Sequence, residues 1–132
     1  MKMDFDEKII LVTGGTGSFG RAFARRVLAN HKPKKLIIFS RDEQKQFDMS
    51  TASEFSQYSK ELRFFIGDVR DYDRLEMALR DVDYVIHAAA MKHIDIIEHE
   101  PIQACNINVV GSLNIISAST KYNVPITVAV ST

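Results

Sequence analysis

Short apolar segments alternate with longer amphipathic ones along this chain, and the alternation predicts its secondary structure. Runs of four to eight apolar residues are typical of buried strands, whereas a period of 3.6 residues indicates a helix. Strands are expected at 8–12, 36–39, 62–66, 84–86 and 126–130. Helices are expected at 18–30, 42–55, 71–79 and 101–122. Pro101 suits the first turn of the last helix, because a proline there gives up only an N–H group that has no helical partner.

Continuously apolar strands separated by helices indicate a parallel sheet that is covered on both faces. With right-handed crossovers, the prediction is an α/β fold with a doubly wound, Rossmann-like sheet of five strands in the order 3-2-1-4-5. All 132 residues form one domain in this interpretation. The last strand is expected to run almost to Thr132 with no helix after it, so the fold is expected to be truncated after strand five. An exposed apolar edge strand then favours a homo-oligomer, and a natural and an artificial truncation both remain open.

Composition and charge narrow the classes of partner. The chain has 17 basic and 17 acidic residues, a balance that argues against non-specific binding to nucleic acid or to an anionic membrane. The single cysteine, Cys105, cannot form an intrachain disulfide and suits a reducing compartment. The charged N-terminus is not typical of a signal peptide, and no apolar run approaches the roughly 20 residues that span a bilayer. A cytoplasmic protein without nucleic-acid or membrane partners is expected.

The stretch TGGTGSFG links the first strand to the first helix, and its glycines predict a dinucleotide site. Gly14 permits the tight turn, Gly17 lets a phosphate approach the backbone, and Gly20 lets the helix pack against the strand. The helix N-terminus also offers N–H groups and a positive dipole to a pyrophosphate. Gly15 is taken as filler in this spacing, which therefore departs from the strict GxGxxG pattern. The alternative is a glycine-rich turn that binds no ligand.

The second strand ends in residues that bear on the choice of cofactor. An acidic residue is expected here when the cofactor is NAD, whereas an arginine suits the 2′-phosphate of NADP. Twenty positions after Gly20 lies Ser40, followed by Arg41, so NADP is predicted over NAD. Lys45 can add positive charge one helical turn further on. The alternative is a solvated, charged loop.

The later strand ends carry further candidates. Asp68 can accept a hydrogen bond from the adenine amino group, or it can be a turn or cap residue. The small residues Ala88 and Ala89 can let a ribose lie against the backbone, and Lys92 can reach ribose, pyrophosphate or substrate phosphate. Histidines and acids also gather between His87 and Glu100, but their spacing fits no standard zinc pattern, so no metal site is predicted.

These motifs together resemble a known family. TGGTGSFG, FSRDE, GDVRD, HAAAMKH and EPIQACNINVVG resemble the extended short-chain dehydrogenases/reductases, and more closely the inverting UDP-N-acetylglucosamine 4,6-dehydratases of bacterial polysaccharide and flagellin-sugar biosynthesis. The resemblance implies an NADP-dependent lyase that converts UDP-GlcNAc to a 4-keto-6-deoxy sugar nucleotide with inverted C5. By matching position it places Lys92 against both cofactor and substrate, and Thr132 as the catalytic hydroxyl. The residues that it implies line the cofactor are Thr16, Gly17, Ser18, Phe19, Ser40 to Lys45, Asp68, Val69, Ala88 and Ser131.

The sequence departs from the family pattern at its end. The family has an acid–lysine pair after the serine–threonine of strand five, and a Tyr-x-x-x-Lys pair beyond it, but this sequence stops at Thr132. None of its four tyrosines is followed by a lysine four residues later. The expected function is therefore the NADP-binding portion of such a dehydratase, inactive in isolation. Alternatives are another sugar-nucleotide enzyme, a C4 epimerase or a retaining dehydratase, and a non-catalytic NADP-sensing module.

Overall fold

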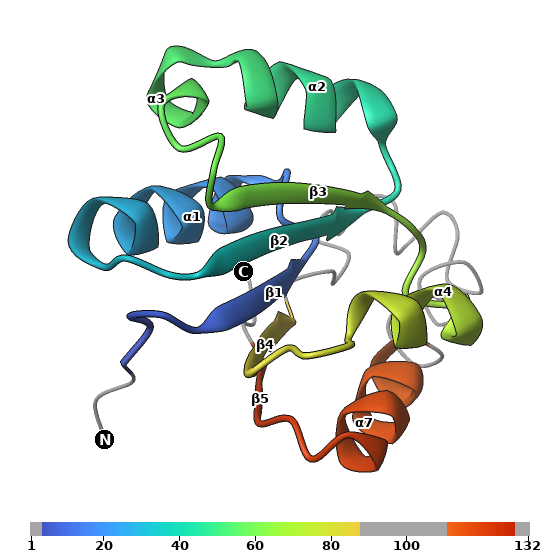
Figure 1. Cartoon of the computed structure of the whole chain (residues 1–132). Coiled ribbons are helices and arrows are strands. Elements are labelled where there is room, and N and C mark those ends of the chain that lie inside the picture. Colours follow the sequence, from blue (N-terminus) through green and yellow to red (C-terminus); the bar gives the residue numbers. More distant parts are fainter. Residues whose placement is uncertain (1–3, 88–110, 129–132) are drawn as a thin grey trace.

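The computed structural model describes residues 4–87 and 111–128, and these form a sheet flanked by helices (Figure 1). The sheet is parallel, with the strand order β3-β2-β1-β4-β5. Its strands are β1 (Ile9–Thr13), β2 (Lys35–Ser40), β3 (Leu62–Ile66), β4 (Tyr84–His87) and β5 (Ile126–Val128). The helices are α1 (Ser18–Asn30), α2 (Glu43–Thr51), α3 (Ser53–Ser56), α4 (Tyr72–Ala78) and α7 (Gly111–Lys121).

The predicted α/β class and the strand order 3-2-1-4 are confirmed. β1 lies in the centre and pairs with β2 on one side and with β4 on the other, with Val12 opposite both Ile38 and Ile86. β5 pairs with β4 over three residues. The expected continuation of this strand to residue 130 lies outside the described residues, so the truncation after strand five remains a prediction.

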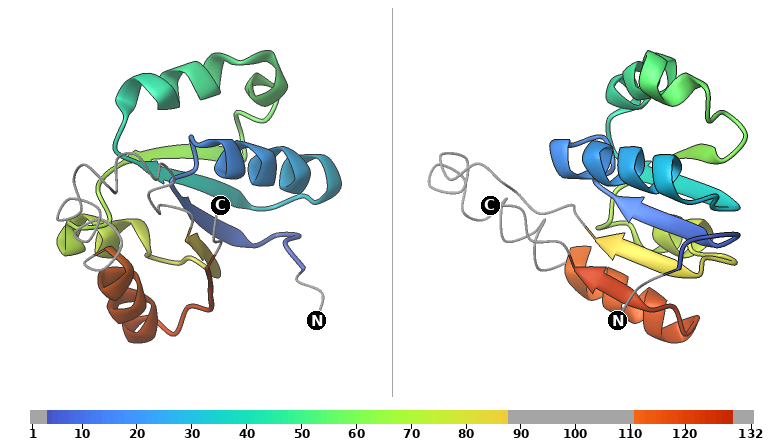
Figure 2. Two further views of the ribbon diagram at one scale, coloured as in Figure 1. Left: turned by 180° about the vertical axis from the view of Figure 1, so that it is seen from behind. Right: turned by 90° about the vertical axis from the view of Figure 1, so that its left-hand side faces the viewer.

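Two separate apolar cores cover the two faces of the sheet, as doubly wound folds require. Successive side chains of a strand point to opposite faces, so Ile10 and Val12 join one core while Ile9 and Leu11 join the other. Helices α1, α2 and α3 pack on the first face, and α4 and α7 on the second (Figures 1 and 2). Because the strands are parallel, they all end at one edge of the sheet (Figure 2), where the loops that precede α1, α2 and α4 begin.

The helix expected at 42–55 is wrong as a single element. The structure has two helices there, α2 and α3, separated at Ala52, whose backbone is extended (φ −62°, ψ 139°). The hydroxyls of Ser50 and Thr51 donate to the carbonyl of Phe47, and such local bonds compete with helix propagation. The break directs the side chain of Phe55 into the core that contains Ile10 and Val12, where Phe55 is 1% exposed.

The other predicted elements are confirmed within a residue or two. α1 and β3 have the predicted bounds, and α4 begins one residue later than expected because Asp71 is its N-cap. The helix predicted at 101–122 is confirmed over Gly111–Lys121, and its earlier part lies outside the described residues. Across residues 4–87 and 111–128, no helix has the length and apolar character needed to cross a bilayer.

Candidate functional site

Backbone hydrogen bonds bring three loops together at the carboxyl edge of the sheet. The Gly14 N–H donates to the carbonyl of Phe39 at 2.9 Å, which joins the loop after β1 to the end of β2. The Gly67 N–H donates to the carbonyl of Ser40 at 2.9 Å, which joins the loop after β3 to the same strand end. The ends of β1, β2 and β3, which carry most of the predicted cofactor residues, thus lie side by side at this edge.

The glycine loop is tightly constrained by backbone contacts. Gly14 has φ 64°, a left-handed conformation that disfavours residues with a Cβ. The Gly17 N–H donates to the carbonyl of Gly14 at 3.1 Å and closes the turn. A Cβ on Gly20 would lie 2.4 Å from the Cα of Gly15, so α1 packs against the loop at a distance that only glycine permits. The predicted roles of Gly14 and Gly20 in turn and packing agree with this geometry.

The treatment of Gly15 as filler is wrong. A Cβ on Gly15 would lie 2.7 Å from Cγ2 of Ile38, and the Gly15 backbone is also the surface that Gly20 contacts. Gly15, Gly17 and Gly20 have the spacing GxGxxG, so the strict pattern was present in the sequence and the choice of Gly14 as the first glycine concealed it.

α1 begins at this loop without a capping side chain. Its N-cap is Gly17, no side-chain hydrogen bond caps it, and its first turn contains no acidic residue. Thr16 is half-buried and Ser18 is exposed, while Phe19 is half-buried and stacks on Phe23 with ring centroids 6.2 Å apart. This end of α1 therefore presents backbone N–H groups and its dipole toward the carboxyl edge.

The end of β2 separates a buried serine from exposed cations. Ser40 is 7% exposed, and its hydroxyl accepts a hydrogen bond of 2.8 Å from Nε2 of Gln46. Arg41 and Lys45 are exposed. The sequence interpretation missed Gln46; the available signal was its position three residues before Met49, on the apolar side of α2.

Asp68 is held by an arginine at the end of β3. Arg70 donates through Nη2 to Oδ2 at 2.7 Å and through its backbone N–H to Oδ1 at 2.9 Å. The side-chain hydrogen bond from Arg70 holds the pKa of the Asp68 carboxyl below its ordinary value of 3.8. Arg41 lies further away, with Nη1 3.9 Å from Oδ2. Asp68 is thus an anion in a structured turn. The adjacent Val69 is buried in the core that contains Ile9 and Leu11.

His87 at the end of β4 is a packed residue. It is 6% exposed, and its Nδ1 lies 2.7 Å from the hydroxyl of Thr13 in a buried hydrogen bond. Burial lowers the pKa of His87 below its ordinary value of 6.5. The predicted site residues that follow β4 or end the chain lie outside the described residues; these are Ala88, Ala89, Lys92, Ser131 and Thr132.

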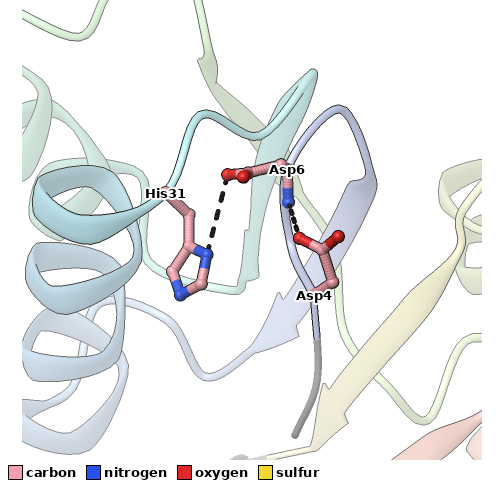
Figure 3. A group of neighbouring side chains, drawn as sticks. All are labelled: Asp4, Asp6 and His31. Carbon is pink, nitrogen blue, oxygen red and sulfur yellow. Dashed lines mark hydrogen bonds and ion pairs between the residues drawn. The ribbon is translucent and has the colours of Figure 1, made fainter.

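At the opposite end of β1, Asp4, Asp6 and His31 lie close together (Figure 3). Oδ1 of Asp6 is 3.6 Å from Nδ1 of His31 and accepts the Lys32 N–H at 2.8 Å. The ring of Phe5 packs edge-on against His31. These contacts fasten the N-terminal segment to the connection between α1 and β2, far along the sheet from the glycine loop.

A protein-family model described as "Polysaccharide biosynthesis protein" matches residues 10–132. The chain belongs to this family. The match includes the glycine loop and the ends of β2 and β3. Two curated relatives are similar to this chain.

The first relative is a UDP-N-acetylglucosamine 4,6-dehydratase (inverting) of Campylobacter jejuni, 50% identical over 97% of this chain and 37% of its own length. The second is a UDP-glucose 4-epimerase of Rickettsia bellii, 44% identical over 97% of this chain and 37% of its own length. The chain thus spans little more than a third of the curated relatives that it matches.

Solved structures agree with the fold. The structure of Pen from Bacillus thuringiensis superposes with a TM-score of 0.86 at 38% identity, covering 96% of this chain and 38% of that one. A UDP-glucose 4-epimerase of Thermus thermophilus in complex with NAD superposes with a TM-score of 0.68 at 26% identity, covering 88% of this chain and 35% of that one. Chains of this architecture therefore include sugar-nucleotide enzymes and a protein solved with a nicotinamide dinucleotide.

Proposed function

We propose that this chain is the NADP-binding portion of a C5-inverting UDP-GlcNAc 4,6-dehydratase. The observation that carries the proposal is the start of α1: a glycine turn at the end of the central strand, followed by a helix N-terminus that no side chain caps. The identity of 50% to the Campylobacter jejuni enzyme supports the choice of reaction. The role in polysaccharide or flagellin-sugar biosynthesis is proposed on the same ground.

The close packing of the glycine loop supports the proposal. Side chains on Gly15 and Gly20 would collide with Ile38 at 2.7 Å and with the Gly15 backbone at 2.4 Å, so the loop, β2 and the start of α1 lie close together. Gly17, Ser18 and Phe19 would hold the pyrophosphate through backbone N–H groups at the positive end of α1. When bound, NADP would act as a reversible hydride acceptor.

The ends of β2 and β3 would hold the adenosine half. Arg41 directly follows β2 and Lys45 lies in the first turn of α2; both are exposed, and in the proposal they bind the 2′-phosphate of NADP. Arg70 pairs with Asp68 at 2.7 Å, while Arg41 is 3.9 Å from the same carboxylate. Because Arg70 makes the closer ion pair with Asp68, the Arg41 guanidinium remains able to bind an external anion. In the proposal, Asp68 also accepts a hydrogen bond from the adenine amino group.

Binding of UDP-GlcNAc by Lys92, participation of Ser131 and Thr132, homo-oligomer formation and a cytoplasmic location are part of the same proposal. They rest on the resemblance and on the relatives named above. The 132-residue chain alone is proposed to be inactive, because no Tyr-x-x-x-Lys pair occurs in it. Incubation with UDP-GlcNAc and NADP should give no 4-keto product, and product formation would contradict this part of the proposal.

Calorimetric titration of the purified chain with NADPH and with NADH tests the cofactor. We expect NADPH to bind more tightly, and Arg41→Ala to weaken NADPH binding by at least about tenfold while changing NADH binding little, since a charge-assisted hydrogen bond contributes roughly 1.5–3 kcal/mol. Arg26→Ala is the matched control, because Arg26 is an exposed arginine on the outer face of α1. Equal affinity for the two cofactors would overturn the choice of NADP.

A second candidate is a UDP-glucose 4-epimerase. The 44% identity to the Rickettsia bellii enzyme favours it, and the Thermus thermophilus neighbour was solved with NAD. Preference for NADH in the same titration, with Arg41→Ala without effect, would favour this candidate over the dehydratase.

A further inference from the structure

Gln46 is a buried polar residue that links the ends of two strands. It lies in α2, is 5% exposed, and donates through Nε2 to the hydroxyl of Ser40 at 2.8 Å and to the carbonyl of Phe65 at 3.1 Å. Ser40 is the last residue of β2, and Phe65 is the penultimate residue of β3. One amide group thus spans from a helix to both strand ends.

Apolar packing alone does not account for this glutamine. A buried amide is unfavourable unless its hydrogen bonds are made, and a methionine of similar length would fill the same volume without that requirement. Gln44, two residues earlier in α2, makes the contrast clear: it is exposed and donates only along its own helix, to Asp48 at 3.0 Å.

The two strand ends that Gln46 joins carry the charges proposed to hold the adenosine half of the cofactor. Arg41 directly follows Ser40, and Asp68 lies three residues after Phe65. Nη1 of Arg41 is 3.9 Å from Oδ2 of Asp68, so a small shift of one strand end against the other changes how strongly Arg41 is drawn to this carboxylate.

We propose that Gln46 is a positioning residue for cofactor specificity. By fixing the Ser40–Arg41 turn against β3, it keeps the Arg41 guanidinium where it distinguishes a ribose 2′-phosphate from a 2′-hydroxyl. The inference rests on the proposed NADP function.

Gln46→Met tests the inference in the 132-residue chain. We expect the ratio of NADPH to NADH affinity to fall about fivefold, with NADH affinity nearly unchanged, because the lost hydrogen bonds displace Arg41 and leave the glycine loop intact. A residue that only stabilises the fold would leave this ratio at its wild-type value. Gln44→Met is the matched control, and its ratio should equal that of the wild type.

A double variant separates positioning from direct effects. In an Arg41→Ala background, Gln46→Met should no longer change the NADPH to NADH ratio, because the group that it positions is gone. If Gln46→Met does not fold, Gln46→Asn keeps the amide but shortens its reach, and the same fall in ratio is expected.

The outcomes distinguish this inference from the function on which it rests. A wild-type ratio in folded Gln46→Met overturns the role of Gln46 while the NADP proposal stands. A wild-type chain without preference for NADPH overturns the NADP proposal and the inference with it. Equal effects of Gln46→Met in the presence and absence of Arg41 also overturn the positioning role.

Discussion

At the carboxyl edge of the sheet, α1 and α4 begin in different ways. α4 begins after Asp71, whose carboxylate accepts the Arg74 N–H at 3.2 Å, and its first turn contains Asp73. α2 follows the same plan, with Asp42 as N-cap. α1 begins after Gly17, with no capping side chain and no acidic residue in its first turn.

The difference shows where an external anion is expected. The first N–H groups of a helix need acceptors, and the positive end of its dipole favours negative charge. α2 and α4 meet both needs with their own carboxylates, so their ends are complete within the chain. α1 has neither a capping carboxylate nor an acidic residue in its first turn, which is why the proposed pyrophosphate is placed at its start rather than at α2 or α4.

The largest effect is expected from Gly20→Ala, which tests whether the α1 start depends on close backbone packing. The added Cβ would lie 2.4 Å from the Cα of Gly15, so helix and loop must separate. We expect a loss of about 2–3 kcal/mol in the free energy of unfolding and loss of NADPH binding. Urea unfolding followed by circular dichroism measures the first, and calorimetry the second. Ala29→Ser, at an exposed position of α1, should leave both unchanged; an unaltered unfolding midpoint for Gly20→Ala would contradict the packing.

Gly17→Asp converts the start of α1 into the kind found at α4. Its backbone (φ −76°, ψ 176°) accepts any residue, so the fold should be retained or slightly stabilised by the new cap. NADPH affinity should fall by at least about tenfold, or 1.4 kcal/mol, since the carboxylate occupies the N–H groups and repels phosphate. Gly17→Asn, a neutral cap, should weaken NADPH binding less. Undiminished NADPH affinity in Gly17→Asp would show that α1 does not hold the pyrophosphate.

Asp71→Ala makes the reverse change by removing the cap of α4. The free energy of unfolding should fall by about 1 kcal/mol, because an N–H group loses its acceptor. NADPH affinity should not change, because Asp71 belongs to a helix start that needs no external anion. A fall in NADPH affinity matching that of Gly17→Asp would remove the distinction between the two helix starts. Thermal unfolding of Asp71→Ala measures the change in stability, and calorimetric titration of the same variant measures the NADPH affinity.

The smallest effect is expected from Arg70→Met at the turn before α4. Arg70 lowers the pKa of Asp68, so the ion pair stabilises the fold fully above pH 3.8 and is lost as the pH falls through the lowered pKa. The variant should be less stable than the wild type by about 0.5–1 kcal/mol at pH 7, and the difference should disappear in acid. Arg26→Met, at an exposed position of α1, should show no such pH dependence. A difference that stays constant from pH 7 to pH 2 would contradict the ion pair.

Local pattern predicted most of the fold and part of the site. The bounds of α1 and the start of α2, to within one residue, follow from short-range signals, namely apolar periodicity and the residues typical of a helix start. The break at Ala52 was not predicted, because it depends on where the Phe55 side chain enters the core. The local spacing of apolar residues carries no information on that position. Gln46 was missed because a glutamine in a helix usually faces solvent.

The alternation of strands and helices and the glycine turn after the first strand could be derived from the amino-acid sequence, because hydrophobic period and the absence of a Cβ are properties of the residues themselves. Three contacts required the folded chain: Gly15 faces Ile38, Arg70 rather than Arg41 holds Asp68, and Gln46 joins β2 to β3. Each of these contacts depends on which strands are neighbours in the sheet and on whether a side chain is long enough to reach across a loop. Such distances are fixed when the sheet assembles and its strand ends meet at one edge.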